Sequence, residues 1–203
     1  MSERSGALPS ADGAEAESQA LMFVRLWAEE VIRQTGRVQE IRERVRGYHR
    51  MHGDGPGIDS HFLEEAFREQ WAAEHTLLWA AYQLERWRKR LDRERGETER
   101  KYDAKLLGAR NVLEHLDSAD FRDGKAVAPP WSPPAQPKKR KPQDPYRSLR
   151  ALDGLYIGTS DDGSFCGIAS SELSDRALDV VKSVEADLAE EAVAHLIELG
   201  RGR

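Results

Sequence analysis

Residues 77–82 read Leu-Leu-Trp-Ala-Ala-Tyr and lie inside a longer helical pattern, from about 59 to 94. A helix that is apolar on all sides is buried on several sides, so we expect this stretch to be the centre of a helical bundle. Asp59 or Ser60 is suited to begin the helix as its N-cap, and Gly96 to end it. Residues 86–95 are mostly cationic and predict a solvated helix end. Apolar residues recur near one face of the helix: Leu63, Phe67, Trp71, Leu78 and Tyr82.

Three further helices are expected around this one. The first spans about 15–50, a third spans about 98–120 with Thr98 as its cap, and the last spans about 171–199. The first and last helices carry long apolar stripes. The stripe of the first helix is Val24, Trp27, Val31, Val38, Ile41, Val45 and Tyr48. The stripe of the last helix is Leu173, Ala177, Val180, Val181, Val184, Leu188 and Leu196. The fold class is therefore mostly α, a four-helix-type bundle with long helices, and residues 15–121 form its core.

The remaining segments are a tail, a linker and a hairpin. Residues 1–14 predict a flexible tail, and residues 122–150 a proline-rich basic linker, because 125–147 hold seven of the nine prolines. The basic run at 138–141 has two interpretations, a nuclear-import or nucleic-acid patch and a solvated loop. Two apolar runs around Asp161-Asp162-Gly163 predict a β-hairpin before the last helix, with strand confined to about 155–168. Residues 151–203, the hairpin and last helix, should pack on the bundle.

Composition limits the classes of function. The formal net charge is −5, so the whole chain lacks the basic footprint of a tight nucleic-acid binder, although a local basic patch could serve a small or transient substrate. Cys166 is the single cysteine, which excludes an internal disulfide and suits a reducing compartment; we expect it to fill space in the hairpin. No stretch has the length and apolarity of a signal segment or a membrane span. We therefore expect a cytoplasmic protein with no membrane partner.

One motif carries chemistry. Residues 110–115 read Arg-Asn-Val-Leu-Glu-His. At about 100° per residue, Leu106, Ala109, Leu113 and Leu116 share a core face, with Arg110 at its edge. Asn111 and His115 form an i, i+4 pair nearly opposite the core, where the asparagine amide can orient the imidazole.

Such residues suit phosphodiester cleavage. An imidazole can move a proton at a 2′-hydroxyl or leaving oxygen, and a guanidinium can hold the phosphate, so no metal or other cofactor is required. One copy of the motif is sparse for an active site, and a second copy across a dimer would supply a second imidazole and guanidinium. The alternative is an ordinary exposed helical face on which Arg110 and Glu114 form an i, i+4 ion pair.

Arg110, Asn111 and His115 follow the order R-N-x-x-x-H, which resembles the signature of the HEPN family of α-helical domains, many of them metal-independent ribonucleases. The resemblance implies that Arg110 and His115 are catalytic, that Asn111 supports them, and that the site forms between two copies of the chain. It also implies RNA as substrate and, in a bacterial toxin–antitoxin or defence system, an antitoxin or other protein partner. The looser pattern of an Arg followed by a His also occurs at Arg44/His49, Arg46/His52 and Arg68/His75.

Glu74 and His75, in the apolar second helix, are secondary site candidates together with Glu114. If they point inward they must be hydrogen-bonded, and a satisfied core histidine is the favoured interpretation of His75. The six histidines show no metal-ligand spacing, so no metal site is expected. A different class of function stays open: a non-catalytic helical interaction or scaffold protein with an inactive site, whose stripes bind a partner helix.

Overall fold

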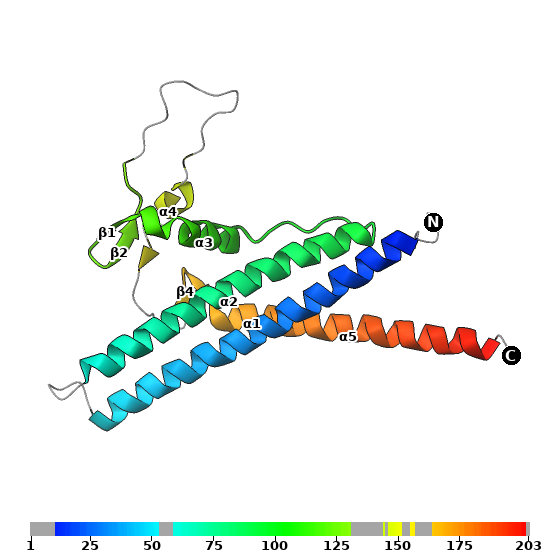
Figure 1. Ribbon diagram of the computed structural model, residues 1–203, viewed down its shortest axis with the longest axis horizontal. Helices are drawn as coiled ribbons and strands as arrows, with labels where there is room; N and C mark the ends of the chain where they lie inside the picture. Colours follow the sequence, from blue (N-terminus) through cyan, green and yellow to red (C-terminus); the bar gives the residue numbers. More distant parts are fainter. Residues whose placement is uncertain are drawn as a thin grey trace, which may run out of the picture.

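Three long helices dominate the computed structural model, which describes residues 11–52, 59–130, 144, 146–151, 155–156 and 164–201 (Figure 1). Helices α1 (Ala11–His52) and α2 (Ser60–Glu94) lie side by side as an antiparallel hairpin, and α5 (Ser170–Arg201) packs mainly against α1. The shorter α3 (Ala104–Glu114) lies on α2. This confirms a mostly α fold of the four-helix type. None of the described helices has the length and apolarity to cross a membrane.

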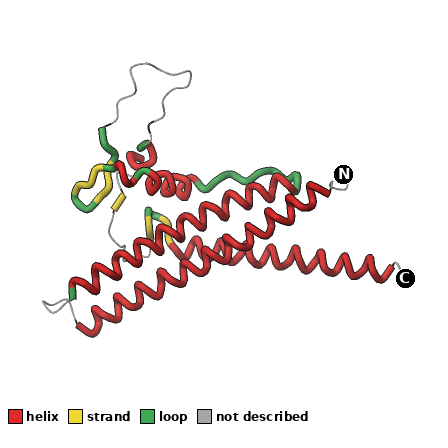
Figure 2. Tube along the Cα trace, in the orientation of Figure 1, coloured by secondary structure: helices red, strands yellow, loops and turns green. Residues whose placement is uncertain are grey.

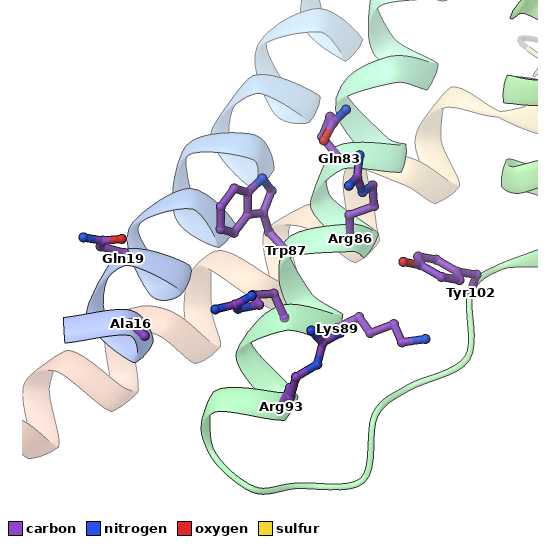
Figure 3. Close-up of a pocket in the computed structure, with 9 residues that line it drawn as sticks. Ala16, Gln19, Gln83, Arg86, Trp87, Lys89, Arg93 and Tyr102 are labelled. Carbon is purple, nitrogen blue, oxygen red and sulfur yellow. The ribbon is translucent and has the colours of Figure 1, made fainter. Parts of the chain in front are cut away.

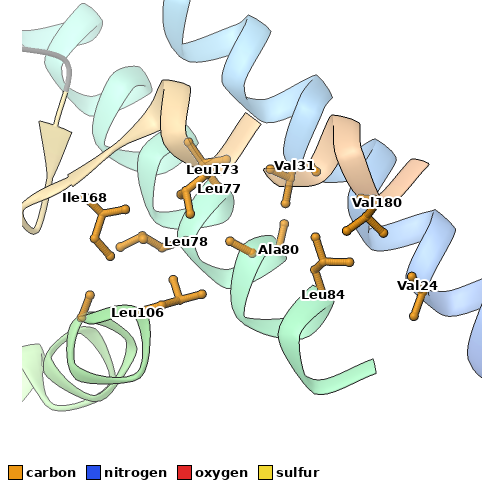
Figure 4. Packing of buried hydrophobic residues seen from close by; sticks show 14 of the residues in the cluster. Val24, Val31, Leu77, Leu78, Ala80, Leu84, Leu106, Ile168, Leu173 and Val180 are labelled. Atoms are coloured by element: carbon orange, nitrogen blue, oxygen red, sulfur yellow. The ribbon is translucent and has the colours of Figure 1, made fainter. Parts of the chain in front are cut away.

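The core lies where these four helices meet (Figure 4). The predicted α1 stripe is buried at Val24, Val31, Val38 and Ile41, as the periodicity indicates. The middle of α2 is also buried as expected, except that the side chain of Trp79 is 41% exposed. Other members of the core are Leu77, Leu78, Ala80, Ala81 and Leu84 of α2, Leu106 and Ala109 of α3, and Leu173, Ala177, Val180 and Val184 of α5.

Helix α5 extends past the bundle. Its apolar stripe is buried as far as Val184, whereas Leu188 and Leu196 are exposed. Figure 1 shows the C-terminal turns projecting beyond the paired helices. The apolar side chains in the last turns of the predicted stripe are therefore exposed, rather than buried against another element, in the described part of the chain.

The strands differ from those predicted (Figure 2). A hairpin does precede the last helix, but it is the tight pair β4 (Ser164–Phe165) and β5 (Ile168–Ala169). Its turn residues Cys166 and Gly167 both have positive φ, 53° and 71°, which suits a two-residue hairpin turn. The predicted pairing across 161–163 is wrong, because β3 (Leu155–Tyr156) pairs instead with β2 (Lys125–Val127).

Strand is not confined to residues 155–168 either. β2 also pairs with β1 (Asp120–Arg122), which makes a three-stranded sheet. Asp123 and Gly124 form the turn at φ 51° and 73°. Asp-Gly is a strong hairpin signal, so the dipeptide at 123–124 also indicates a hairpin, in addition to the one predicted at 161–163. A second small core under this sheet joins Val112, Ala126, Leu155 and Leu149, the last from α4 (Arg147–Ala151).

The helix predicted at 98–120 is too long at both ends. Asp103, not Thr98, is the N-cap, since its carboxylate accepts hydrogen bonds from the backbone N–H groups of Lys105 and Leu106. Arg100 binds the buried Asp92 through its backbone N–H and its guanidinium, which ties the non-helical connector to α2. At the other end α3 stops at Glu114, and a 3-10 turn, η1 (Leu116–Ser118), follows.

Two predicted boundaries also change. The 122–150 linker contains part of the sheet and of α4, so only some of it lacks regular structure, while residues 131–143, with the basic run, lie outside the described residues. The N-terminal tail is predicted too long, because α1 begins at Ala11. Residues 1–10 lie outside the described residues.

Candidate functional site

Arg110 lies on α3 where that helix faces α2. Its Nη1 donates a hydrogen bond of 3.0 Å to Oδ1 of Asn111, and its Nη2 forms an ion pair with Glu114. The guanidinium carbon is 5.0 Å from the ring centroid of Tyr82 on α2, a cation–π distance. The ion pair considered in the sequence is therefore present, and three neighbours hold the guanidinium at the surface, where the side chain is 25% exposed.

His115 is directed to another part of the molecule. It is the C-cap of α3, not a mid-helix residue as predicted, and its ring is 6.1 Å from that of Tyr146, edge to face. Five residues at about 100° each place Arg110 and His115 about 140° apart around the helix. One copy of the chain therefore does not bring the two side chains to a common point, and the contacts described for Asn111 join it to Arg110.

His75 shares a surface hollow with Arg110. This hollow, of about 420 Å³, is lined by His75, Thr76, Leu78 and Trp79 of α2 and by Arg110, Leu113 and Glu114 of α3; we call it the Arg110 hollow. His75 is exposed, so the interpretation of a buried core histidine is wrong. The sequence did not single out Trp79, because an apolar run predicts burial and does not tell which of its residues faces outward.

Glu74 is a buried bundle residue and does not line the hollow. It is 1% exposed, and its Oε1 accepts hydrogen bonds from Nη2 of Arg42 at 2.6 Å and from Nε2 of Gln70 at 2.8 Å. Arg42 also reaches the Ser170 hydroxyl, at 3.5 Å, so this network joins α1, α2 and α5. Burial raises the pKa of Glu74 although the hydrogen bonds from Gln70 and Arg42 oppose that rise. Glu74, a secondary site candidate from the sequence, therefore helps to join the helices inside the bundle.

A second hollow, the basic groove, lies at the C-terminal end of α2 (Figure 3). Its volume is about 480 Å³, and its lining is Ala16, Gln19, Gln83, Arg86, Trp87, Lys89, Arg90, Arg93 and Tyr102. Glu99 binds Lys89 at 3.1 Å and Arg93 at 2.9 Å, so part of the positive charge is neutralised. The sequence indicated a solvated cationic helix end here, but did not place Tyr102 beside it.

Comparisons with known proteins add no relative. No family model matches this chain, and neither the curated proteins nor the solved structures contain a match. The resemblance to the HEPN family therefore depends on the motif and on the helical class of the fold. Among the residues that the structure describes, no group of three or more histidine, cysteine, aspartate or glutamate side chains is placed to hold a metal ion.

Proposed function

We propose that this chain is a HEPN-like, metal-independent ribonuclease that acts as a homodimer. In this proposal the working pair is Arg110 of one copy and His115 of the other. A role in a bacterial toxin–antitoxin or defence system, with an antitoxin or similar protein partner, and a cytoplasmic location belong to the same proposal.

The observation that carries the proposal is the position of Arg110. It lies at an exposed hollow, beside the 41% exposed Trp79, which leaves it open to an RNA phosphate and to the His115 of a second copy. His115 of the same chain faces Tyr146 instead, so a complete pair needs a second copy. A twofold dimer would form two equivalent sites, because each copy offers both halves of the pair.

The chemistry follows from the two side chains. The imidazole takes the proton of an RNA 2′-hydroxyl, and the 2′-oxygen attacks the adjacent phosphorus. The bond from phosphorus to the 5′-oxygen breaks, and that oxygen takes up a proton from water. A 2′,3′-cyclic phosphate remains, and the imidazolium releases its proton to the solvent. The guanidinium of Arg110 stabilises the charge on the phosphate, which requires that the phosphate displace Glu114 from it.

The test is cleavage of a labelled single-stranded RNA in the presence of EDTA. We expect the wild type to cut the RNA but not DNA of the same sequence, which has no 2′-hydroxyl. Arg110→Ala and His115→Ala should each lose about 10²-fold or more in rate while keeping the helical circular-dichroism spectrum. Arg44→Ala and Arg68→Ala are matched controls from the looser motif matches and should retain full activity.

Three outcomes would overturn the proposal. The first is a wild type that does not cut RNA. The second is full activity in His115→Ala. The third is loss of activity in His75→Ala but not in His115→Ala, because the imidazole would then come from the Arg110 hollow of the same chain.

A non-catalytic interaction protein is the second candidate, and the exposed end of α5 favours it. Leu188, Val193, Leu196 and Ile197 are between 38% and 67% exposed, which is unusual for an apolar helix that serves only the bundle. A wild type that leaves RNA intact and sediments as a monomer would favour this candidate over the ribonuclease.

A further inference from the structure

We propose that the outer face of α2 is a binding track for single-stranded RNA, running from the Arg110 hollow to the basic groove. The track consists of His75, Trp79, Tyr82, Arg86, Lys89 and Arg93, with Tyr102 beside it. This inference rests on the proposed function only in naming RNA as the nucleic acid. It goes beyond that function because it assigns binding residues outside the R-N-x-x-x-H motif.

The track residues lie on one stripe of α2. Their positions, 75, 79, 82, 86, 89 and 93, are separated by three or four residues throughout, so they follow one side of the helix. The 18 residue-to-residue steps from His75 to Arg93 correspond to a rise of about 27 Å. That length suits a short segment of extended strand, near the lower end of the roughly 4–16 nucleotides that single-strand-binding domains cover.

A chain of side-chain contacts connects the two hollows. The Arg110 guanidinium lies 5.0 Å from the Tyr82 ring, and the Tyr82 and Tyr102 rings stack with centroids 6.4 Å apart. Lys89 Nζ then lies 4.8 Å from the Tyr102 ring. Figure 3 shows Tyr102 on the connector after α2, facing the helix that carries Arg86 and Lys89.

The chemistry of the stripe fits a polyanion that carries planar bases. Cations can follow phosphates, while exposed aromatic rings accept stacked bases of any sequence. Trp79 and Tyr102 are 41% and 37% exposed, and Arg86 and Arg93 are also exposed. No stripe position is acidic, although the chain has 36 acidic residues. Those on the same part of α2 lie off the stripe, at Glu85, Asp92 and Glu94.

Glu99 neutralises part of the positive charge in the basic groove. It binds both Lys89 and Arg93, so an arriving phosphate must compete with this carboxylate. Arg86 has no acidic partner within the described part of the chain and should be the strongest phosphate contact. The three track cations Arg86, Lys89 and Arg93 would give a slope of about −2 for the logarithm of affinity against that of salt, at about −0.7 per phosphate neutralised on a single strand.

The experiment uses a fluorescent 2′-O-methyl oligouridine, which lacks the nucleophile for cleavage, so binding is measured on the intact wild-type protein. We expect Arg86→Gln/Arg93→Gln to weaken binding at low salt by tenfold or more and to reduce the salt slope by about 1.4. Arg25→Gln/Arg33→Gln, which removes two exposed cations from α1, is the matched control and should bind as the wild type does. Trp79→Ala should weaken binding without changing the slope, because stacking releases no counterions.

The track is wrong if the wild type does not bind the oligonucleotide, or if the two double variants lose affinity equally. It is also wrong if Arg86→Gln/Arg93→Gln leaves binding of the oligonucleotide unchanged. A changed oligomeric state in that variant would then indicate that this face of α2 binds protein. The ribonuclease proposal fails separately: binding along the track without cleavage of ordinary RNA would leave the track intact and remove the catalytic assignment.

Discussion

Replacing Glu74 with alanine tests the buried network that joins α1, α2 and α5. Glu74 is 1% exposed, and the side chain of its partner Arg42 is 10% exposed. Alanine at position 74 would leave the guanidinium of Arg42 buried without its carboxylate. Breaking a buried pair from one side costs about 3–5 kcal/mol of the free energy of unfolding, far more than an exposed pair contributes.

The assay is urea unfolding followed by circular dichroism. With a denaturant slope of about 2 kcal/mol per molar, a loss of about 4 kcal/mol lowers the unfolding midpoint by about 2 M. Glu43→Ala, which removes the exposed partner of Arg46, is the matched control and should cost less than about 1 kcal/mol. The double variant Arg42→Met/Glu74→Met should recover most of the loss, because neither charge remains buried.

The contribution of Glu74 to the free energy of unfolding should depend on pH in a defined direction. Burial raises the pKa of Glu74 in the folded state, so the stability linked to this group is complete below its unfolded pKa and is lost as pH rises through the folded value. Glu74→Gln should remove that part of the dependence. A cost below about 1 kcal/mol in Glu74→Ala, or no recovery in the double variant, would refute the structural role assigned to the network.

Three further predictions concern α3 and the β4–β5 turn. Asp103→Ala should lower the free energy of unfolding by about 1 kcal/mol or more through the lost N-cap. Burial would raise the pKa of Asp103, but Arg176 and two backbone N–H groups hold that pKa low, so the stability difference between wild type and variant should shrink as pH falls through the folded pKa. A stability difference that grows in acid would contradict this. Gly167→Ala should cost about 1–2 kcal/mol by thermal melting, because φ is 71° there, and an unchanged melting temperature would be the opposing result. Burial raises the pKa of Cys166 to about 12, so iodoacetamide at pH 8 should label it far more slowly in the folded protein than in denaturant, and equal rates would show an accessible thiolate.

The long helices were predictable because each stripe repeats over many turns, so single exceptions such as Trp79 do not change the result. The short strands were not. Each of them is only two or three residues long, and the turn at Cys166-Gly167 needs a positive φ at a cysteine, which no propensity indicates. The start of α3 was missed because two residues, Thr98 and Asp103, are acceptable caps. The choice between them depends on the tertiary contact of Arg100 with Asp92.

The candidate site was predictable in part. The helical wheel placed Arg110 at the edge of the core face, which agrees with a side chain 25% exposed. It could not show that α3 ends at Glu114 and leaves His115 beside Tyr146, because that end depends on how the chain enters η1. Nor could it show that His75 lies in the same hollow as Arg110, which is decided by the packing of α3 on α2.

Complementation between two inactive variants tests the central claim most directly. Arg110→Ala and His115→Ala carry different affinity tags, and the heterodimer is purified through both. If Arg110 of one copy works with His115 of the other, one of the two sites in this heterodimer is intact. We then expect about half of the wild-type rate of RNA cleavage, while each homodimeric variant stays inactive. A heterodimer as inactive as its parents would contradict a site built from one Arg110 and one His115 of different copies.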